Sequence, residues 1–295
     1  MTESLIQSRP PSLKPPSLHQ VRSEQSRRHL IRFTEHINPH YRSAQHHHRI
    51  ADKLEAIERG EIDRLMIFMP PRHGKSQLAS RTFPAWCLGR DPHRQIIAAS
   101  YNSDLASDFG RDVRNIVGGP EFGEVFPGVG LRPDSKAANR MNTNVGGCYI
   151  AAGVGTAVTG RGANIALIDD PFKDREEADS ETIRNKVWSW YQSTLFTRLM
   201  PGAAIVLIQT RWHEDDLAGR LLEQNADEWE ILDLPAISDA GEALWPEWYD
   251  LPALERIKAT IGPREWSALY QQRPQPDEGT FFRRDWFRSW DIKPD

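Results

Sequence analysis

The sequence PPRHGKSQ, residues 70–77, follows a short apolar run, LMIFM at residues 65–69, and opens a stretch of helical character from Lys75. A phosphate-binding loop needs consecutive backbone N–H groups directed into one concavity, a helix N-terminus behind them and a lysine on the phosphates. Gly74-Lys75-Ser76 supplies the Gly-Lys-Ser core of such a loop, although Met69 stands where the usual pattern begins with glycine. The alternative is an ordinary turn between a strand and a helix.

If the loop binds ATP, each residue type has a defined task. Lys75 is expected to contact the β- and γ-phosphates and to act in catalysis, and the Ser76 hydroxyl is expected to bind Mg²⁺. The predicted nucleotide-binding residues of this loop are Arg72, His73, Gly74, Lys75, Ser76 and Gln77.

A second apolar run, IALIDD at residues 165–170, ends in two carboxylates 94 residues after the lysine. A phosphate-loop enzyme needs a carboxylate at the end of a neighbouring buried strand to hold magnesium. Asp169 is therefore predicted to hold the metal and Asp170 to orient the attacking water. Strands that end in aspartate are also common at ordinary strand–helix turns.

Apolar runs alternate with helical patterns along most of the chain, which predicts an α/β domain with a mostly parallel sheet. The region 118–147 is rich in Gly, Pro and Asn and is expected to form loops and short hairpin strands. Pro84 is expected to kink or end the helix that starts at Lys75. Strands are predicted at 65–69, 95–99, 148–152, 165–169, 203–210 and 229–234. Helical structure is predicted to begin at about residue 21, a helix is predicted to end at Gly60, and further helices are predicted at 103–117, 180–199 and 214–224.

Composition excludes several classes of protein. The chain has 295 residues, 39% of them hydrophobic and 26% charged, and no apolar run is long enough to span a bilayer. Cys87 and Cys148 are too few for a disulfide framework or a four-thiolate zinc site. A soluble intracellular protein is expected. Residues 1–50 carry eight Arg or Lys against three Asp or Glu, so they form either a nucleic-acid-contacting arm or a solvated leader.

Changes in composition divide the chain into three parts. Residues 1–20 are rich in Pro and Ser and are predicted to be a disordered leader. Residues 21–234 carry the strand–helix alternation. Residues 235–295 are punctuated by prolines and tryptophans and are predicted to form a helical appendage and linker.

Four motifs in order, PPRHGKS, TGRG, LIDDP and QTRWHEDDL, resemble those of the large terminase subunit, the motor that packages DNA into the procapsids of tailed bacteriophages. The resemblance covers about residues 31–284. It implies an additional-strand P-loop NTPase fold, related to RecA and helicases, with a mostly parallel sheet flanked by helices. It also implies an ATPase with ATP and Mg²⁺ as cofactors.

The resemblance assigns further residues. Arg72 is expected to contact the γ-phosphate, unless it is a surface charge, and Arg161 of TGRG is the candidate finger for a neighbouring subunit, unless it pairs with the acidic run 170–181. Many relatives carry Glu where this chain has Asp170, so Glu214 is the alternative residue for activating water.

Other motif positions concern coupling and base recognition. Gln209-Thr210 occupies the place of the motif that couples hydrolysis to motion, or is simply a strand end. Tyr41 and Gln45 resemble an adenine-reading motif, in which Gln pairs with the base edge and Tyr stacks on it. The adjacent His46, His47 and His48 diverge on a helix and are predicted to be solvated or packed, not metal-binding.

The resemblance also implies partners and a place of action. The expected partners are double-stranded DNA, the portal protein, the small terminase subunit and further copies of the chain in a ring on the procapsid. The chain is expected to act in the cytoplasm of the bacterial host and not to bind a membrane. The family's RNase H-like nuclease is expected to lie beyond residue 295, so this chain is not expected to cut DNA. The alternatives are a helicase-like nucleic-acid translocase and a truncated, inactive prophage remnant that acts only as a binding module.

Overall fold

The computed structural model describes residues 17–158, 160 and 162–275. One mixed sheet organises them, with strand order β3-β4-β5-β2-β6-β7-β1-β8. From β5 to β8 in that order neighbouring strands run parallel, and β3 and β4 form an antiparallel extension at the other edge. The strands are β1 (Arg64–Phe68), β2 (Gln95–Ser100), β3 (Leu131–Lys136), β4 (Arg140–Thr143), β5 (Cys148–Gly153), β6 (Ala163–Asp169), β7 (Leu199–Gln209) and β8 (Glu230–Asp233).

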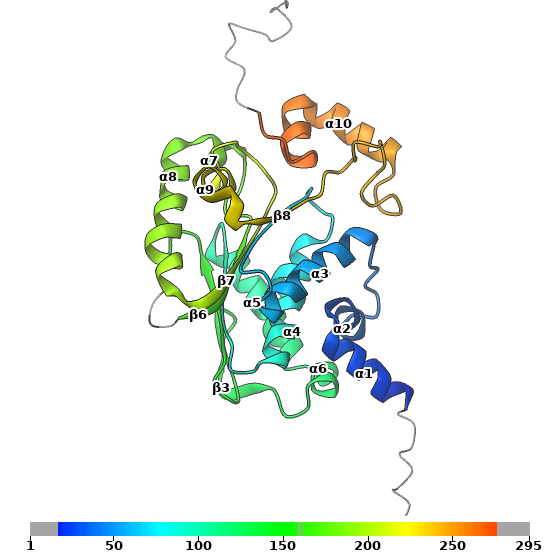
Figure 1. Cartoon of the computed structure of the whole chain (residues 1–295), viewed down its shortest axis with the longest axis vertical. Helices are drawn as coiled ribbons and strands as arrows, with labels where there is room; N and C mark the ends of the chain where they lie inside the picture. The colour runs from blue at the N-terminus through cyan, green and yellow to red at the C-terminus, as the bar shows by residue number, and fades with distance from the viewer. Residues whose placement is uncertain (1–16, 159, 161, 276–295) are drawn as a thin grey trace, which may run out of the picture.

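Helices cover both faces of the sheet (Figure 1). Alternate strand residues point to opposite faces, and in β1 Leu65 and Ile67 pack toward helices α2 to α6, whereas Met66 and Phe68 pack toward α8 and α9. The helices are α1 (Leu18–Arg28), α2 (Leu30–Ile37), α3 (Gln45–Arg59), α4 (Phe83–Arg90), α5 (Ser103–Val117), α6 (Pro120–Val125), α7 (Arg175–Asp179), α8 (Glu181–Trp190), α9 (Leu217–Asn225) and α10 (Leu251–Glu265).

The order of the central strands confirms the predicted fold class. Strand β7 lies between β1, which leads into the phosphate loop, and β6, which ends in Asp169. It pairs in parallel with both, and Gln209 is opposite Phe68 in the register with β1. This inserted strand is the additional strand that the fold class requires.

Two helices differ from the prediction, one in where it starts and the other in how far it continues. Helix α1 begins at Leu18, before residue 21, because Ser17 and Gln20 form a reciprocal capping box. The helix after the phosphate loop continues past Pro84 to Arg90. A π-helical turn, Gln77–Thr82, precedes α4 and places Pro84 in the first turn of α4, where a missing N–H does not break the helix.

The end of the predicted 180–199 helix is also different. Helix α8 ends at Trp190 and is followed by a π-helical turn, Tyr191–Leu195, and a 3₁₀ turn, Phe196–Arg198. Strand β7 then starts at Leu199, earlier than expected. Another 3₁₀ turn, Ala226–Glu228, connects α9 to β8.

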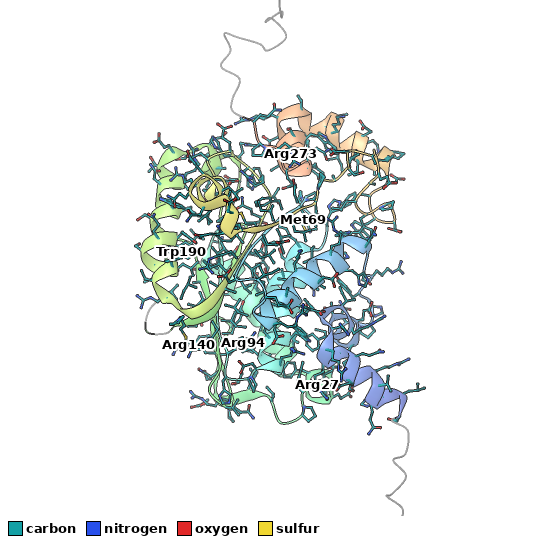
Figure 2. All side chains as sticks on the ribbon, viewed as in Figure 1. Arg27, Met69, Arg94, Arg140, Trp190 and Arg273 are labelled. Carbon is teal, nitrogen blue, oxygen red and sulfur yellow. The ribbon has the colours of Figure 1, made fainter. Side chains whose placement is uncertain are left out.

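The described part of the appendage, residues 235–275, contains helix α10 and packs beside the sheet. Helix α10 is broken at Gly262, whose φ is +82°, and a π-helical turn, Trp266–Tyr270, follows it. Both guanidinium Nε and Nη2 of Arg175 donate to the Glu265 carboxylate at 2.8 Å. Arg273, labelled in Figure 2 near α10, pairs with Asp233 at the end of β8.

No helix within the described residues is long and apolar enough to cross a membrane. Cys87 and Cys148 are both buried, and no disulfide joins them.

Gly110 in α5 offers a test of how tightly this helix packs on the β3–β4 extension. A Cβ at this position would lie 2.0 Å from the carbonyl oxygen of Ala138, a backbone atom that cannot move aside cheaply. Gly110→Ala is expected to lower the free energy of unfolding by about 1–3 kcal/mol through overpacking. Urea denaturation followed by circular dichroism measures it.

Gly123→Ala in α6 is the matched control, because a Cβ added there would have no neighbouring atom within 4 Å and the residue is exposed. Alanine should stabilise that helix by up to about 1 kcal/mol. Equal stability changes in the two variants would contradict the packing of α5 described here.

Candidate functional site

The carboxyl ends of three adjacent strands bring the predicted site residues together. Strand β1 ends just before Met69 (labelled in Figure 2) and the phosphate loop, β6 ends at Asp169, and β7 ends just before Thr210. In open parallel sheets, ligands bind at this edge of the sheet. Residues distant in sequence therefore meet at one place.

Lys75 lies at the centre of this group. Its Nζ donates to Thr210 Oγ1 at 2.5 Å and pairs with Asp170 Oδ2 at 2.8 Å. The Thr210 N–H donates to the other oxygen of Asp170, Oδ1, at 2.9 Å. Lys75 is buried, so its charge is compensated inside the protein rather than by water.

Asp169 is buried next to this pair, with one carboxylate oxygen engaged. Ser80 Oγ donates to Oδ2 at 2.5 Å, whereas Oδ1 is buried and has no hydrogen-bond partner among the described residues. Burial and the charge of Asp170 raise the pKa of Asp169, and Lys75 and Ser80 oppose that rise. An unpartnered buried oxygen beside the Ser76 side chain fits a hard divalent cation, which prefers oxygen ligands.

Sequence reasoning did not identify Ser80. The residue lies four positions after Ser76, one helical turn further along, so a helical spacing from the loop was its only signal.

The loop backbone adopts left-handed conformations at two positions. The φ angles are +63° at Arg72 and +89° at Gly74, and Asp170 has φ +45° at the end of β6. Left-handed backbone is uncommon outside glycine and is concentrated at functional sites. Arg72 is exposed on the loop, and His73 is buried with its ring stacked on Tyr249 at 4.9 Å between ring centres.

Gln209 and Thr210 face different partners. Thr210 belongs to the lysine cluster, while Gln209 Nε2 donates to Asp216 Oδ2 at 2.9 Å. Asp216 also accepts from Arg211 Nε at 2.9 Å and caps α9 through the Gly219 N–H. Asp216, buried and missed by sequence reasoning, is the residue that holds Gln209, and its burial raises its pKa.

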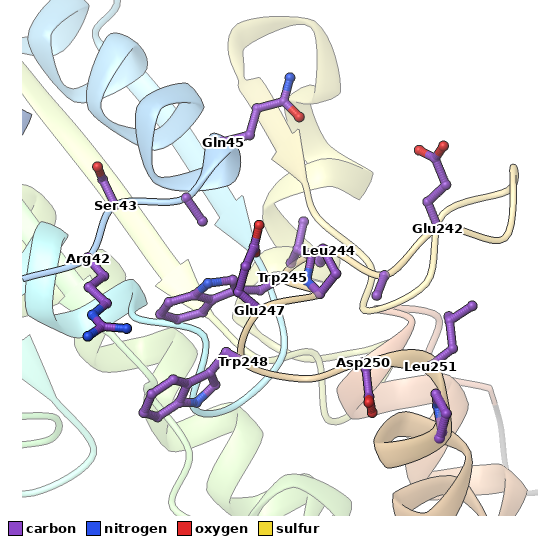
Figure 3. Close-up of a pocket in the computed structure, with 14 residues that line it drawn as sticks. Arg42, Ser43, Gln45, Glu242, Leu244, Trp245, Glu247, Trp248, Asp250 and Leu251 are labelled. Carbon is purple, nitrogen blue, oxygen red and sulfur yellow. The ribbon is translucent and has the colours of Figure 1, made fainter.

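A pocket of about 870 Å³ lies between the start of α3 and the 242–252 segment (Figure 3). Gln45 lines it, together with Arg42 and the indoles of Trp245 and Trp248, whose ring centres are 5.4 Å apart. The Tyr41 ring instead packs on His47 at 5.6 Å between ring centres. Trp245 contacts His47, so the pocket adjoins the helix that touches the phosphate loop.

The three adjacent histidines do not form a metal site. His46 and His47 are buried and packed, and His48 is exposed. Within the described part of the chain, no group of three or more His, Cys, Asp or Glu side chains is arranged to hold a metal ion.

Two candidate residues are not placed in the cluster. Glu214 is exposed, and its backbone carbonyl, not its carboxylate, meets Arg211 Nη2 at 3.5 Å. Arg161 lies outside the described residues.

A known protein family matches most of this chain. The family described as "Terminase large subunit, T4likevirus-type, N-terminal" matches residues 66–289. No curated protein matches the chain.

Solved structures with the same fold include phage terminases. The large terminase of bacteriophage HK97 is 15% identical with a TM-score of 0.56, and the match covers 85% of this chain and 55% of that one. A mutant ATPase domain of the Thermus phage P74-26 large terminase is 14% identical with a TM-score of 0.57, covering 82% of this chain and 98% of that domain. This chain thus spans about half of the HK97 protein and almost all of the isolated domain.

The family match covers most of the chain. The chain belongs to the family of terminase large subunits of the T4likevirus type, and the matched segment corresponds to their N-terminal domain.

Proposed function

We propose that this chain is a Mg²⁺-dependent ATPase that powers the translocation of viral double-stranded DNA into a procapsid. One observation supports it above the others: Lys75 of the phosphate loop forms a closed polar cluster with Asp170 and Thr210, beside Asp169, one of whose carboxylate oxygens has no hydrogen-bond partner among the described residues. An inactive binding module would have no need to keep these charges together in a buried site.

Lys75 is the residue that would compensate the charge of the transferred phosphoryl group. Its ammonium is held by Asp170 and Thr210 in this structure, so binding of a phosphate there replaces one anionic partner with another. Arg72, exposed on the loop, is the second cation available to the γ-phosphate. Both would act by electrostatic stabilisation in the transition state.

Ser76 and Asp169 would hold the magnesium ion. Bound magnesium would neutralise charge on the β- and γ-phosphates. The Ser80 hydroxyl fixes the Asp169 carboxylate in orientation, which leaves Oδ1 as the oxygen that is available to the metal or its water.

Asp170 would orient the attacking water. Its carboxylate is held by the Thr210 N–H, and its backbone N–H donates to the Ile208 carbonyl at 2.9 Å, so the side chain is fixed to β7 rather than free to turn. Glu214, exposed on the following loop, remains the alternative residue for this step.

Gln209 and Thr210 would couple hydrolysis to motion. Thr210 touches Lys75, and the next residue, Arg211, donates its N–H to Gln272 Oε1 at 3.2 Å in the appendage. A chain of contacts thus leads from the phosphate-binding lysine to the segment after α10. A change at the nucleotide would be transmitted along it.

The pocket beside α3 would receive the adenine base. Gln45 offers both a donor and an acceptor to the base edge, and the indoles of Trp245 and Trp248 offer stacking surfaces. Tyr41 would contribute indirectly, by packing on His47.

The motor would work with partners. Double-stranded DNA, the portal protein, the small terminase subunit and further copies of the chain in a ring on the procapsid are the partners that this function requires, in the cytoplasm of the bacterial host. Arg161 would complete the site of a neighbouring copy. A helicase-like translocase is the second candidate, favoured by the same strand order and loop.

Lys75→Ala is expected to reduce ATP hydrolysis by at least about 10²-fold, because the developing phosphoryl charge loses its buried cation. Steady-state phosphate release by the purified chain measures the rate. Lys173→Ala removes an exposed lysine after β6 and should leave the rate unchanged. Equal rates in the Lys75 variant and the wild type would refute the assignment.

Gln45→Ala is expected to lower the preference for ATP over GTP by about tenfold or more, because a bidentate contact between an amide and adenine is worth roughly 1–3 kcal/mol of discrimination. Competition of the two nucleotides for the site measures the preference. Gln224→Ala, an exposed glutamine of α9, is the control. An unchanged preference would place the base elsewhere.

A trans role of Arg161 predicts complementation. Asp170→Asn chains keep Arg161, and Arg161→Ala chains keep Asp170, so each should be inactive alone and their mixture should regain activity at shared sites. An arginine supplied in trans can raise the rate by roughly 10³–10⁵. If no mixture exceeds the separate rates and the wild-type rate per chain does not rise with concentration, Arg161 acts within its own chain.

A further inference from the structure

Two buried histidines of α3 contact the same backbone carbonyl of the phosphate loop. His46 Nε2 lies 3.1 Å and His47 Nε2 lies 3.0 Å from the His73 oxygen. A carbonyl oxygen only accepts hydrogen bonds, so each Nε2 carries a proton and donates it. The two donors engage both lone pairs of that oxygen.

Burial favours the neutral form of both imidazoles. The Ala44 N–H donates to His47 Nδ1 at 2.9 Å, which fixes the proton of that ring on Nε2. Burial lowers the pKa of His47 to about 3 and also lowers the pKa of His46. The rings lie 3.9 Å apart between centres, and Trp245 covers both, at 5.3 and 4.8 Å.

The next residue of the loop is shaped to admit one of these rings. A Cβ on Gly74 would lie 2.4 Å from His47 Nε2, and the φ of Gly74 is +89°. The ring therefore occupies the space that any side chain at this position would need. Glycine is required here by His47 as well as by the backbone conformation.

We propose that His46 and His47 are positioning residues that aim the Gly74 N–H at the β-phosphate of a bound nucleotide, an inference that rests on the nucleotide-binding function proposed above. The peptide between His73 and Gly74 is trans, because the described chain contains no cis bond, so its N–H points opposite to its C=O. Fixing the carbonyl toward α3 directs the amide to the other side, into the concavity of the loop.

The opposite orientation would be harmful. If the His73 carbonyl turned into the loop, it would present the negative end of its dipole to the phosphates. The two histidine donors prevent this by hydrogen bonding to the carbonyl oxygen on the side of α3. An amide can bind an anion only if it does not already donate to another group. Within the described part of the chain, the Gly74 N–H donates no hydrogen bond, so it meets this condition.

The same histidines connect the base pocket to the phosphate loop. Trp245 lines the pocket and packs on both imidazoles, and His73 stacks on Tyr249 of the same segment. His73 Nδ1 also donates to the Pro71 carbonyl at 2.9 Å. The loop is thus fixed from α3 on one side and from the 245–249 segment on the other.

The test compares His46→Leu/His47→Leu with His46→Gln/His47→Gln, which restores a nitrogen donor at a similar reach, and with the exposed control His48→Ala. Affinities for ADP with Mg²⁺ and for AMP are measured by competition with a fluorescent ADP analogue, and thermal unfolding without ligand confirms the fold.

The leucine pair is expected to weaken ADP binding by about tenfold to a hundredfold, the loss of one charge-assisted hydrogen bond. AMP lacks the β-phosphate, so its affinity should change by less than about threefold. The glutamine pair should recover most of the ADP affinity, and His48→Ala should match the wild type.

Unchanged ADP affinity in a folded leucine variant, or equal losses of affinity for ADP and AMP, would overturn this inference but not the proposed function. Failure of the wild-type chain to bind ADP would overturn the proposed function and this inference with it. If the leucine variant does not fold, amide hydrogen exchange of the wild type decides: the Gly74 amide should be protected by ADP with Mg²⁺, and no protection would refute its role.

Discussion

The site is organised around one electrostatic constraint, the placement of a single buried ammonium beside two consecutive carboxylates. Burial and the charge of Asp170 both raise the pKa of Asp169, and the Lys75 ammonium opposes that rise while it pairs with Asp170. This placement requires β1 and β6 to end at the same height with β7 between them, since Thr210 completes the cluster from β7. The parallel order of the central strands brings these three strand ends to the same side of the sheet. The charges and the topology therefore depend on each other.

A second set of contacts fixes backbone rather than charge. The imidazoles of α3 hold the loop from behind, and the indole of Trp245 closes them from water. Strand β7 continues into Arg211 and Asp216, which connect the lysine cluster to the appendage through Gln272. The phosphate loop, the pocket beside α3 and the appendage are consequently joined by short, directed contacts. The contacts around the site therefore extend well beyond the loop itself.

Much of this was readable from the sequence, and the rest was not for physical reasons. The residue ranges of most strands, and the positions of Lys75, Asp169 and Asp170 after or at the ends of strands, follow from apolar runs and local motifs, which are properties of neighbouring residues. The π-helical turn that admits Pro84 was not predicted, because it depends on how the helix packs and not on a propensity. His46 and His47 were expected only to be packed or solvated, since nothing local shows that the loop 26 residues later places a carbonyl above them. Asp216 was missed because its partner Gln209 meets it only after the chain has turned back from β7.

Asp216 has a consequence for how this sequence can vary. The one carboxylate begins a helix, neutralises a guanidinium and orients an amide at the end of β7. Replacing Asp216 alone would leave Arg211 as an uncompensated charge, the Gln209 amide N–H without its acceptor and α9 without an N-cap. Three losses from one substitution make the position resistant to gradual change. Homologues that lack this aspartate are expected to differ at the arginine and the glutamine as well, so substitutions at the three positions should covary.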